Sequence, residues 1–144
     1  MWADTLAALE RGHLLRLALW GGGSLMLGAL ILVFLTWRRT SAPLLWHFAV
    51  QTALWGTVDV AISAWGWRGL ALRDYAGAQQ LLNFLWLNTG LNAGYAMLGV
   101  TLALASWRMG PRPAGIGAGV GIIIQGLVIL LLDMRLIANI GPMQ

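Results

Sequence analysis

Four long apolar segments constrain this sequence more than any other feature. They occupy residues 17–37, 44–67, 81–107 and 114–136. A helix needs about 20 apolar residues to cross the hydrocarbon of a bilayer, and each segment has at least that length. Only helices or closed barrels can satisfy their backbone hydrogen bonds in lipid. We therefore predict an all-α integral membrane protein, in which one domain, residues 1–144, forms a bundle of four transmembrane helices.

The composition agrees with a membrane location. The chain is 59% hydrophobic and 10% charged, with a mean hydropathy of +0.74, which is more apolar than soluble domains usually are. Its formal charge of +4 comes from arginines, but these stand singly or in pairs at the ends of apolar segments, where they anchor helices at the membrane edge. This placement argues against nucleic-acid binding. Cysteine is absent, which excludes disulfides and thiolate metal sites.

Short links predict which helices are neighbours and which side of the membrane they face. The links 38–43 and 108–113 are shorter than the link 68–80, and short links make antiparallel neighbours of the helices that they join. Because arginines are dense in both short links, we place these loops in the cytoplasm and the protein in a bacterial inner membrane.

The two pairs of segments resemble each other at an interval of 70 residues. The chain is thus interpreted as two duplicated helical hairpins, related by an axis along the membrane normal. The alternative is coincidence, since any hairpin tends to end in Trp-Arg and turn at proline. The matching residues are Trp37-Arg38 and Trp107-Arg108, Pro43 and Pro113, and Gly56 and Gly126.

The first sixteen residues are predicted to form a separate, short amphipathic helix that lies in the membrane interface. Trp2, Leu6 and Leu9 recur at i, i+4 and i+7 and form one apolar face. Gly12 is the candidate hinge between this helix and the first span.

Polar side chains follow one stripe of the second segment at intervals of four residues, from His47 to Ser63. Such a stripe must face other helices or water, because polar side chains are costly in hydrocarbon. We take Asp59 as the only acidic residue deep in a span. Two interpretations of Asp59 stay open: a neutral carboxyl that holds helices together through Asn88 or Asn92, or a site for protons or cations.

The third and fourth segments supply partners for this stripe. Asn88, Asn92 and Tyr95 share a helical face, and both asparagines lie at about the depth of Asp59. Gln125 falls near the centre of the fourth segment. The predicted intramembrane polar core consists of Gln51, Trp55, Asp59, Asn88, Asn92, Tyr95 and Gln125.

Glycines at small-xxx-small spacing predict where helices approach closely in lipid. The predicted helix-packing glycines are Gly56, Gly90, Gly94, Gly117 and Gly121.

The sequence lacks the patterns of catalysis. No Ser-His-Asp arrangement, paired carboxylates, metal-ligand spacing or phosphate loop occurs, so we predict a protein that is not an enzyme and holds no metal. His47, near the membrane edge, is a candidate ligand or pigment contact, although interfacial histidines more often bond to protein or lipid. No cofactor is predicted, and pigment, quinone and lipid stay candidates.

Three segments resemble a family of small, uncharacterised four-helix bacterial membrane proteins known only as a domain of unknown function. They are WHFAVQTALWGTVDVAI (46–62), LWLNTGLNAGYAMLGVTL (85–102) and GAGVGIIIQGLVILLLD (117–133). The resemblance implies four helices and no known activity. An acid is common in the family at the place of Asn92 and an amide at that of Asp59. This chain departs from the pattern at both positions, which argues against a fixed catalytic role for Asp59. The distinctive residues are Asn88, Gly90-Leu91, Gly94-Tyr95, Gln125-Gly126 and Asp133.

Three functions fit these observations. The first is a structural or accessory subunit of a larger bacterial membrane complex, respiratory or photosynthetic, with other subunits, a second copy and lipids as partners. The second is a small oligomeric transporter or channel with a polar cavity around Asp59. The third is binding of a lipid, quinone or pigment through His47, Trp55 and Tyr95.

Overall fold

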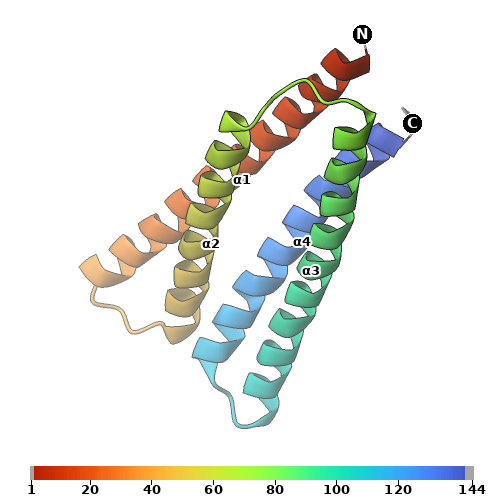
Figure 1. The fold of residues 1–144 in the computed structure, drawn as a ribbon. Helices are drawn as coiled ribbons and strands as arrows, with labels where there is room; N and C mark the ends of the chain where they lie inside the picture. Colours follow the sequence, from red (N-terminus) through yellow and green to blue (C-terminus); the bar gives the residue numbers. More distant parts are fainter. Residues whose placement is uncertain (1, 142–144) are drawn as a thin grey trace.

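The computed structural model describes residues 2–141, which form four α-helices (Figure 1). No strand occurs in this part of the chain, so the predicted all-α fold and four-helix bundle are confirmed. Two of the helices, α1 and α4, are long and apolar enough to cross a membrane. The bounds are α1 Trp2–Trp37, α2 Pro43–Arg68, α3 Tyr75–Arg108 and α4 Pro113–Ile140.

Local signals set where the helices begin. α2 and α4 each start at a proline, Pro43 and Pro113, whose fixed φ suits the first turn of a helix. α3 starts after Asp74, whose side chain accepts a hydrogen bond from the backbone N–H of Gly77 at 2.8 Å. The helices therefore extend beyond the predicted apolar segments, and the loop between α2 and α3 shortens to residues 69–74.

α1 is one uninterrupted helix, so the predicted hinge at Gly12 is wrong. The predicted interfacial segment continues the helix, and its inner face is buried: Leu6 is 1% exposed. This face meets α3 and α4 instead of a membrane surface. The predicted apolar face of this segment exists, but it packs against other helices instead of lipid. The buried residues of this core are Leu6, Ala78, Leu82, Leu85, Leu136, Ile137 and Ile140.

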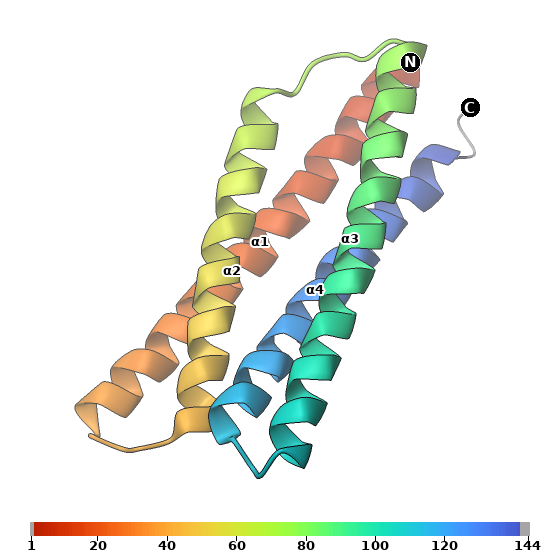
Figure 2. The same cartoon turned by 60° about the horizontal axis from the view of Figure 1, so that its bottom comes forward.

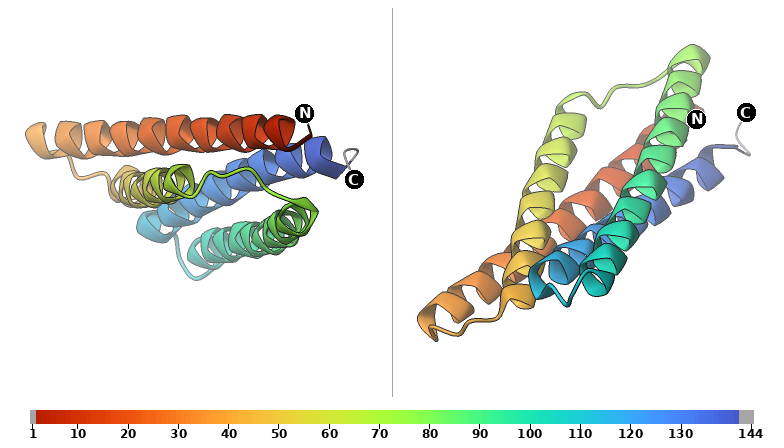
Figure 3. Two further views of the ribbon diagram at one scale, coloured as in Figure 1. Left: turned by 45° about the horizontal axis from the view of Figure 1, so that its top comes forward. Right: turned by 90° about the horizontal axis from the view of Figure 1, so that it is seen from below.

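The helices pack as two hairpins. α1 packs on α2, α3 packs on α4, and α2 also packs on α4. Both short loops lie at one end of the bundle, while the start of α1 and the end of α4 lie at the other (Figures 1 and 3). α2 and α3 hardly contact each other, and the loop 69–74 spans the gap between them (Figure 2).

In both hairpins, glycines at corresponding positions allow the two helices to approach closely. A Cβ added at Gly28 on α1 would lie 2.5 Å from the carbonyl oxygen of Ala49 on α2. A Cβ added at Gly99 on α3 would lie 2.8 Å from the carbonyl oxygen of Gly119 on α4. These contacts are related by 70 to 71 residues along the chain. The packing thus agrees with the interval of the repeat in the sequence.

Three of the predicted packing glycines lie at helix contacts, and two do not. A Cβ added at Gly56, Gly117 or Gly121 would come within 3.0 Å of another helix. A Cβ added at Gly90 or Gly94 would meet nothing within 4 Å. Both of these glycines are exposed on α3, so the prediction that they join helices of this chain is wrong.

Candidate functional site

A cavity of about 570 Å³ occupies the gap between α2 and α3. α1 and α4 also line it, and Arg73 reaches it from the loop 69–74. Pockets that bind small molecules usually measure about 300–1,000 Å³, so this cavity is large enough for such a molecule. Its polar lining residues are Glu10, His13, Asp59, Arg73, Gln80, Asn88, Asn92, Tyr95, Gln125 and Asp133.

Aromatic and aliphatic side chains from α2 and α3 form the outer part of the cavity. Trp65 on α2 and Phe84 on α3 both line it and are also exposed at the surface. The rings of Trp55 and Tyr95 meet edge to face, with centroids 4.7 Å apart and planes inclined by 67°. This pair connects α2 to α3 in a region where the two helices otherwise stand apart.

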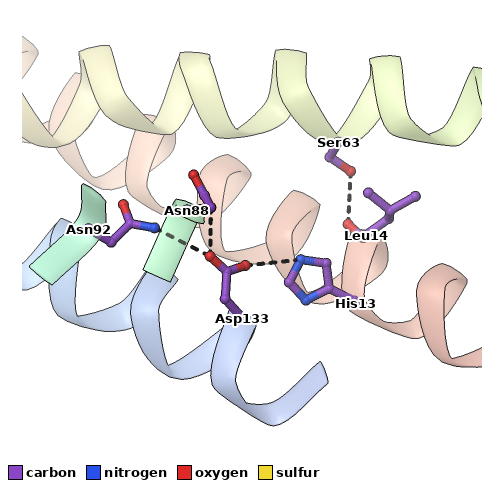
Figure 4. A network of polar contacts seen from close by, with 6 residues as sticks. All are labelled: His13, Leu14, Ser63, Asn88, Asn92 and Asp133. Carbon is purple, nitrogen blue, oxygen red and sulfur yellow. Dashed lines mark hydrogen bonds and ion pairs between the residues drawn. The ribbon is translucent and has the colours of Figure 1, made fainter. Parts of the chain in front are cut away.

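Asp133 is the centre of a polar cluster that joins three helices (Figure 4). The side-chain amides of Asn88 and Asn92 on α3 donate to its Oδ2 at 2.6 and 3.3 Å. His13 Nε2 on α1 lies 3.5 Å from its Oδ1. Asp133 itself belongs to α4 and is 2% exposed. The cluster therefore holds α1, α3 and α4 in register.

Asp59 belongs to a second polar chain. The side-chain amide of Gln125 on α4 donates to Asp59 Oδ2, and Trp20 Nε1 on α1 donates to Gln125 Oε1 at 3.1 Å. Asp59 is 4% exposed. The ion pairs in the described part of the chain involve other carboxyl groups. The partner of Asp59 is instead the neutral side-chain amide of Gln125.

The predicted partners of Asp59 were wrong. Asn88 and Asn92 lie at a suitable depth, but they donate to Asp133. The reason is that α4, not α3, packs on α2 and brings Gln125 to Asp59.

Most of the predicted polar core nevertheless lines one cavity. Gln51 is the exception, because its Cβ lies against Gly121 on α4 instead. The six predicted core residues that line the cavity are Trp55, Asp59, Asn88, Asn92, Tyr95 and Gln125.

Four ionisable residues that line the cavity lie outside the predicted core: Glu10, His13, Arg73 and Asp133. Glu10 and His13 belong to the stretch that was assigned to the membrane interface, and Asp133 shows that Asp59 is not the only acidic residue deep in a helix. A signal for Asp133 was present: it follows Gln125 by eight residues, which places both side chains on one face of α4.

Glu10 and Arg73 form an ion pair at the end of the cavity that lies near the α2–α3 loop. Arg73 Nη2 and Nε donate to the Glu10 carboxylate at 2.7 and 3.0 Å. This hydrogen bonding to Glu10 raises the pKa of Arg73 above its ordinary value. The pair ties the loop 69–74 to α1, and both of its residues line the cavity.

We expect Glu10→Gln to lower the free energy of unfolding by about 1 to 2 kcal/mol, because charge-assisted hydrogen bonds are lost while Arg73 is partly open to solvent. Arg73→Gln should cost a similar amount, and the double variant should cost less than the sum of both. Arg68→Gln, at an exposed position nearby, is the control. Thermal unfolding in mild detergent measures all four variants, and strictly additive losses would contradict the pairing.

His47 lies outside this site. It is exposed in the first turn of α2, and its Nδ1 lies 2.9 Å from the carbonyl oxygen of Pro43. This bond is of the kind expected of an interfacial histidine. The pigment contact stays a prediction.

Among residues 2–141, no three histidine, aspartate or glutamate side chains lie together as the ligands of a metal ion would. The side chains that line the cavity carry amides, carboxyl groups, one imidazole, one guanidinium group and other aromatic rings.

A family model, that of a family of unknown function (DUF6992), matches residues 16–134. The chain belongs to this family, and the resemblance to an uncharacterised family is confirmed. The matched region contains Asp59, Gln125 and Asp133, whereas Glu10 and His13 lie before it. No curated protein and no solved structure matches the chain.

Proposed function

We propose that this member of a family of unknown function binds a membrane-soluble amphipathic small molecule, of the lipid, quinone or pigment type, in the cavity between α2 and α3. The observation that carries this proposal is the division of the cavity into two parts. Its outer part is aromatic and aliphatic, and its inner part carries amides and carboxyl groups. Small-molecule sites commonly combine an apolar wall with a few polar groups that orient the ligand.

The proposal includes a membrane setting, with all four helices crossing the bilayer of a bacterial cytoplasmic membrane. Large apolar side chains are exposed on every helix, among them Leu19, Ile62 and Leu131, and so many exposed apolar side chains would favour association in water. Exposed Thr57 and Thr101 donate their hydroxyl hydrogens to carbonyls of their own helix at 2.9 Å. Polar groups that face lipid need such internal partners.

In this setting, the ligand would enter sideways between α2 and α3. Ile62 on α2 and Leu91 on α3 line the cavity and are also exposed, so they border its opening toward lipid. The apolar body of the ligand would lie between them. Its polar head would reach the inner amides, of which Gln125 is the deepest buried.

Leu91→Trp tests this arrangement by filling the opening. We expect one small molecule per chain to remain bound when the wild type is purified from membranes in mild detergent, and the variant should retain at least tenfold less, a loss of about 1.4 kcal/mol in binding. Leu98→Trp is the control, because Leu98 lies on the same helix, is 63% exposed against 62% for Leu91, and does not line the cavity.

Mass spectrometry of the intact protein measures retention. Equal retention by both tryptophan variants would contradict binding in this cavity. A wild type that carries no small molecule, and takes up none when titrated with decylubiquinone or phosphatidylcholine, would overturn the proposal.

A second candidate function, that of an accessory subunit of a larger membrane complex, is supported by Gly90 and Gly94. These glycines lie four residues apart on α3 and open to free space, and such pairs let helices of different chains approach closely in lipid. Purification from the native membrane tests this role. Migration with other subunits would support it, and migration as a single chain would count against it.

A further inference from the structure

We propose that the ligand of the cavity is a lipophilic organic cation, an amine or quaternary ammonium group joined to an apolar body, and that Asp59 is its counter-ion. This inference rests on the proposed binding function and narrows its ligand to one chemical class.

The balance of charges around the cavity is the first argument. Three carboxyl groups line it, those of Glu10, Asp59 and Asp133, but only one permanently charged cation, Arg73. Arg73 is already paired with Glu10. The lining therefore leaves Asp59 and Asp133 without a permanently charged cation.

The partners of each carboxyl group show which of them lacks a cation. Asp133 has two amide donors and His13 beside it. Asp59 is bonded to the neutral amide of Gln125, and no arginine or histidine forms an ion pair with it in the described chain. A bound cation would therefore give Asp59 the charged partner that the described chain does not supply.

Because Asp59 is buried, a carboxylate there without a cationic partner is costly. The charge of the ligand's head group should therefore affect its affinity. A carboxylate in apolar surroundings is unfavourable unless a cation or several donors compensate it. A cationic head would supply that compensation in a medium that screens charge weakly. The neutral head of a quinone would supply less, and an anionic head would be repelled.

The aromatic residues give a second, independent argument. Trp55 precedes Asp59 by one helical turn on α2, so both side chains lie on the same side of the helix. The rings of Trp55 and Tyr95 meet at an angle of 67° and form a corner in the cavity lining. Aromatic faces attract organic cations, and tryptophan does so most strongly.

Three probes that share a dodecyl chain test the charge of the head: dodecyltrimethylammonium, dodecanol and dodecyl sulfate. The full chain is placed in nanodiscs of digalactosyldiacylglycerol, an uncharged lipid without an ammonium group, and binding is measured by equilibrium dialysis with empty nanodiscs subtracted. We expect the cation to bind at least tenfold more tightly than dodecanol, and dodecyl sulfate to bind least.

Asp59→Asn and Asp133→Asn then locate the counter-ion. Asp59→Asn keeps the shape of the side chain and should reduce affinity for the cation at least tenfold, with less than a twofold change for dodecanol. Asp133→Asn is the matched control in the same cavity and should reduce cation binding by a smaller factor.

Each outcome decides one claim. Equal binding of cation and dodecanol by the wild type, with no change in Asp59→Asn, would overturn the cationic ligand and leave the proposed binding function standing. A cation preference lost only in Asp133→Asn would overturn the role of Asp59. No binding of any probe above empty nanodiscs would overturn both the inference and the binding function.

A measurement on the wild type alone gives a second test. Dicyclohexylcarbodiimide modifies carboxyl groups in apolar surroundings, and mass spectrometry identifies the modified residue. We expect dodecyltrimethylammonium to slow modification of Asp59 at least fivefold and dodecanol to have no effect. Equal protection by both probes would contradict a direct contact between the cation and Asp59.

Discussion

Gly28→Leu should separate α1 from α2 and lower the free energy of unfolding by more than about 3 kcal/mol. A Cβ at Gly28 would lie 2.5 Å from the carbonyl oxygen of Ala49 and 2.7 Å from the backbone nitrogen of Ala53. Because these atoms belong to the backbone of α2, no side chain can turn aside to make room. Overpacking of a well-packed side-chain core costs about 1–3 kcal/mol, and a clash with backbone atoms should exceed this range.

Gly90→Leu is the matched control, since the same change at an exposed glycine meets no atom within 4 Å. Leucine is also the better helix former, by up to about 1 kcal/mol. We therefore expect Gly90→Leu to be neutral or slightly stabilising for the single chain. Thermal unfolding in mild detergent compares both variants with the wild type. Equal stability of the two variants would contradict the close contact of α1 and α2.

The same glycines show what the sequence could predict. Small-xxx-small spacing marks positions where a helix has no bulk, but it does not say which way that face points. Gly117 and Gly121 face α2, whereas Gly90 and Gly94 point away from the rest of the chain. Apolar length predicted that the four helices exist and where α1, α2 and α3 end, because both follow from local sequence, but α1 and α3 begin earlier than their apolar segments. The rotation of each helix about its axis depends on all of its neighbours.

The polar contacts of the candidate site also depend on how the helices are rotated and arranged, which the sequence does not give. Depth along the helix axis placed Asn88 and Asn92 level with Asp59, and the residues do line one cavity. Depth could not show that α4 packs on both α2 and α3 and supplies Gln125 and Asp133 as partners. The membership of the polar core was thus largely predictable, and its pairing was not.

The prediction missed the burial of Glu10 and His13 in the site for a different reason. Charged residues in the first turns of a chain are typical of a segment at the membrane surface, and Gly12 suggested a hinge. The structure instead continues α1 past Gly12 and buries both side chains. A pattern in the sequence could have indicated this, since Leu6, Glu10 and Leu17 recur at i, i+4 and i+11 on one face.

Asp133→Leu should lower the free energy of unfolding on the order of 3 kcal/mol, because it leaves several polar groups without a partner. Asn88 and Asn92 lose the carboxylate oxygen to which both donate, and buried His13 loses its neighbouring carboxyl group. A hydrogen bond between helices contributes about 1 kcal/mol, and a buried polar group left unpaired costs about 1–3 kcal/mol.

Two further variants separate the lost hydrogen bonds from a mere change of shape. Asp133→Asn keeps the shape and an accepting oxygen, so it should cost about 1 kcal/mol or less. The double variant Asp133→Leu with Asn88→Leu removes both partners of the shortest bond in the cluster, at 2.6 Å, and should be more stable than Asp133→Leu alone. Thermal unfolding compares these three variants and the single variant Asn88→Leu in one detergent. If the double variant is less stable by the full sum of the single losses, then Asn88 and Asp133 stabilise the bundle independently, and the cluster does not hold α3 to α4.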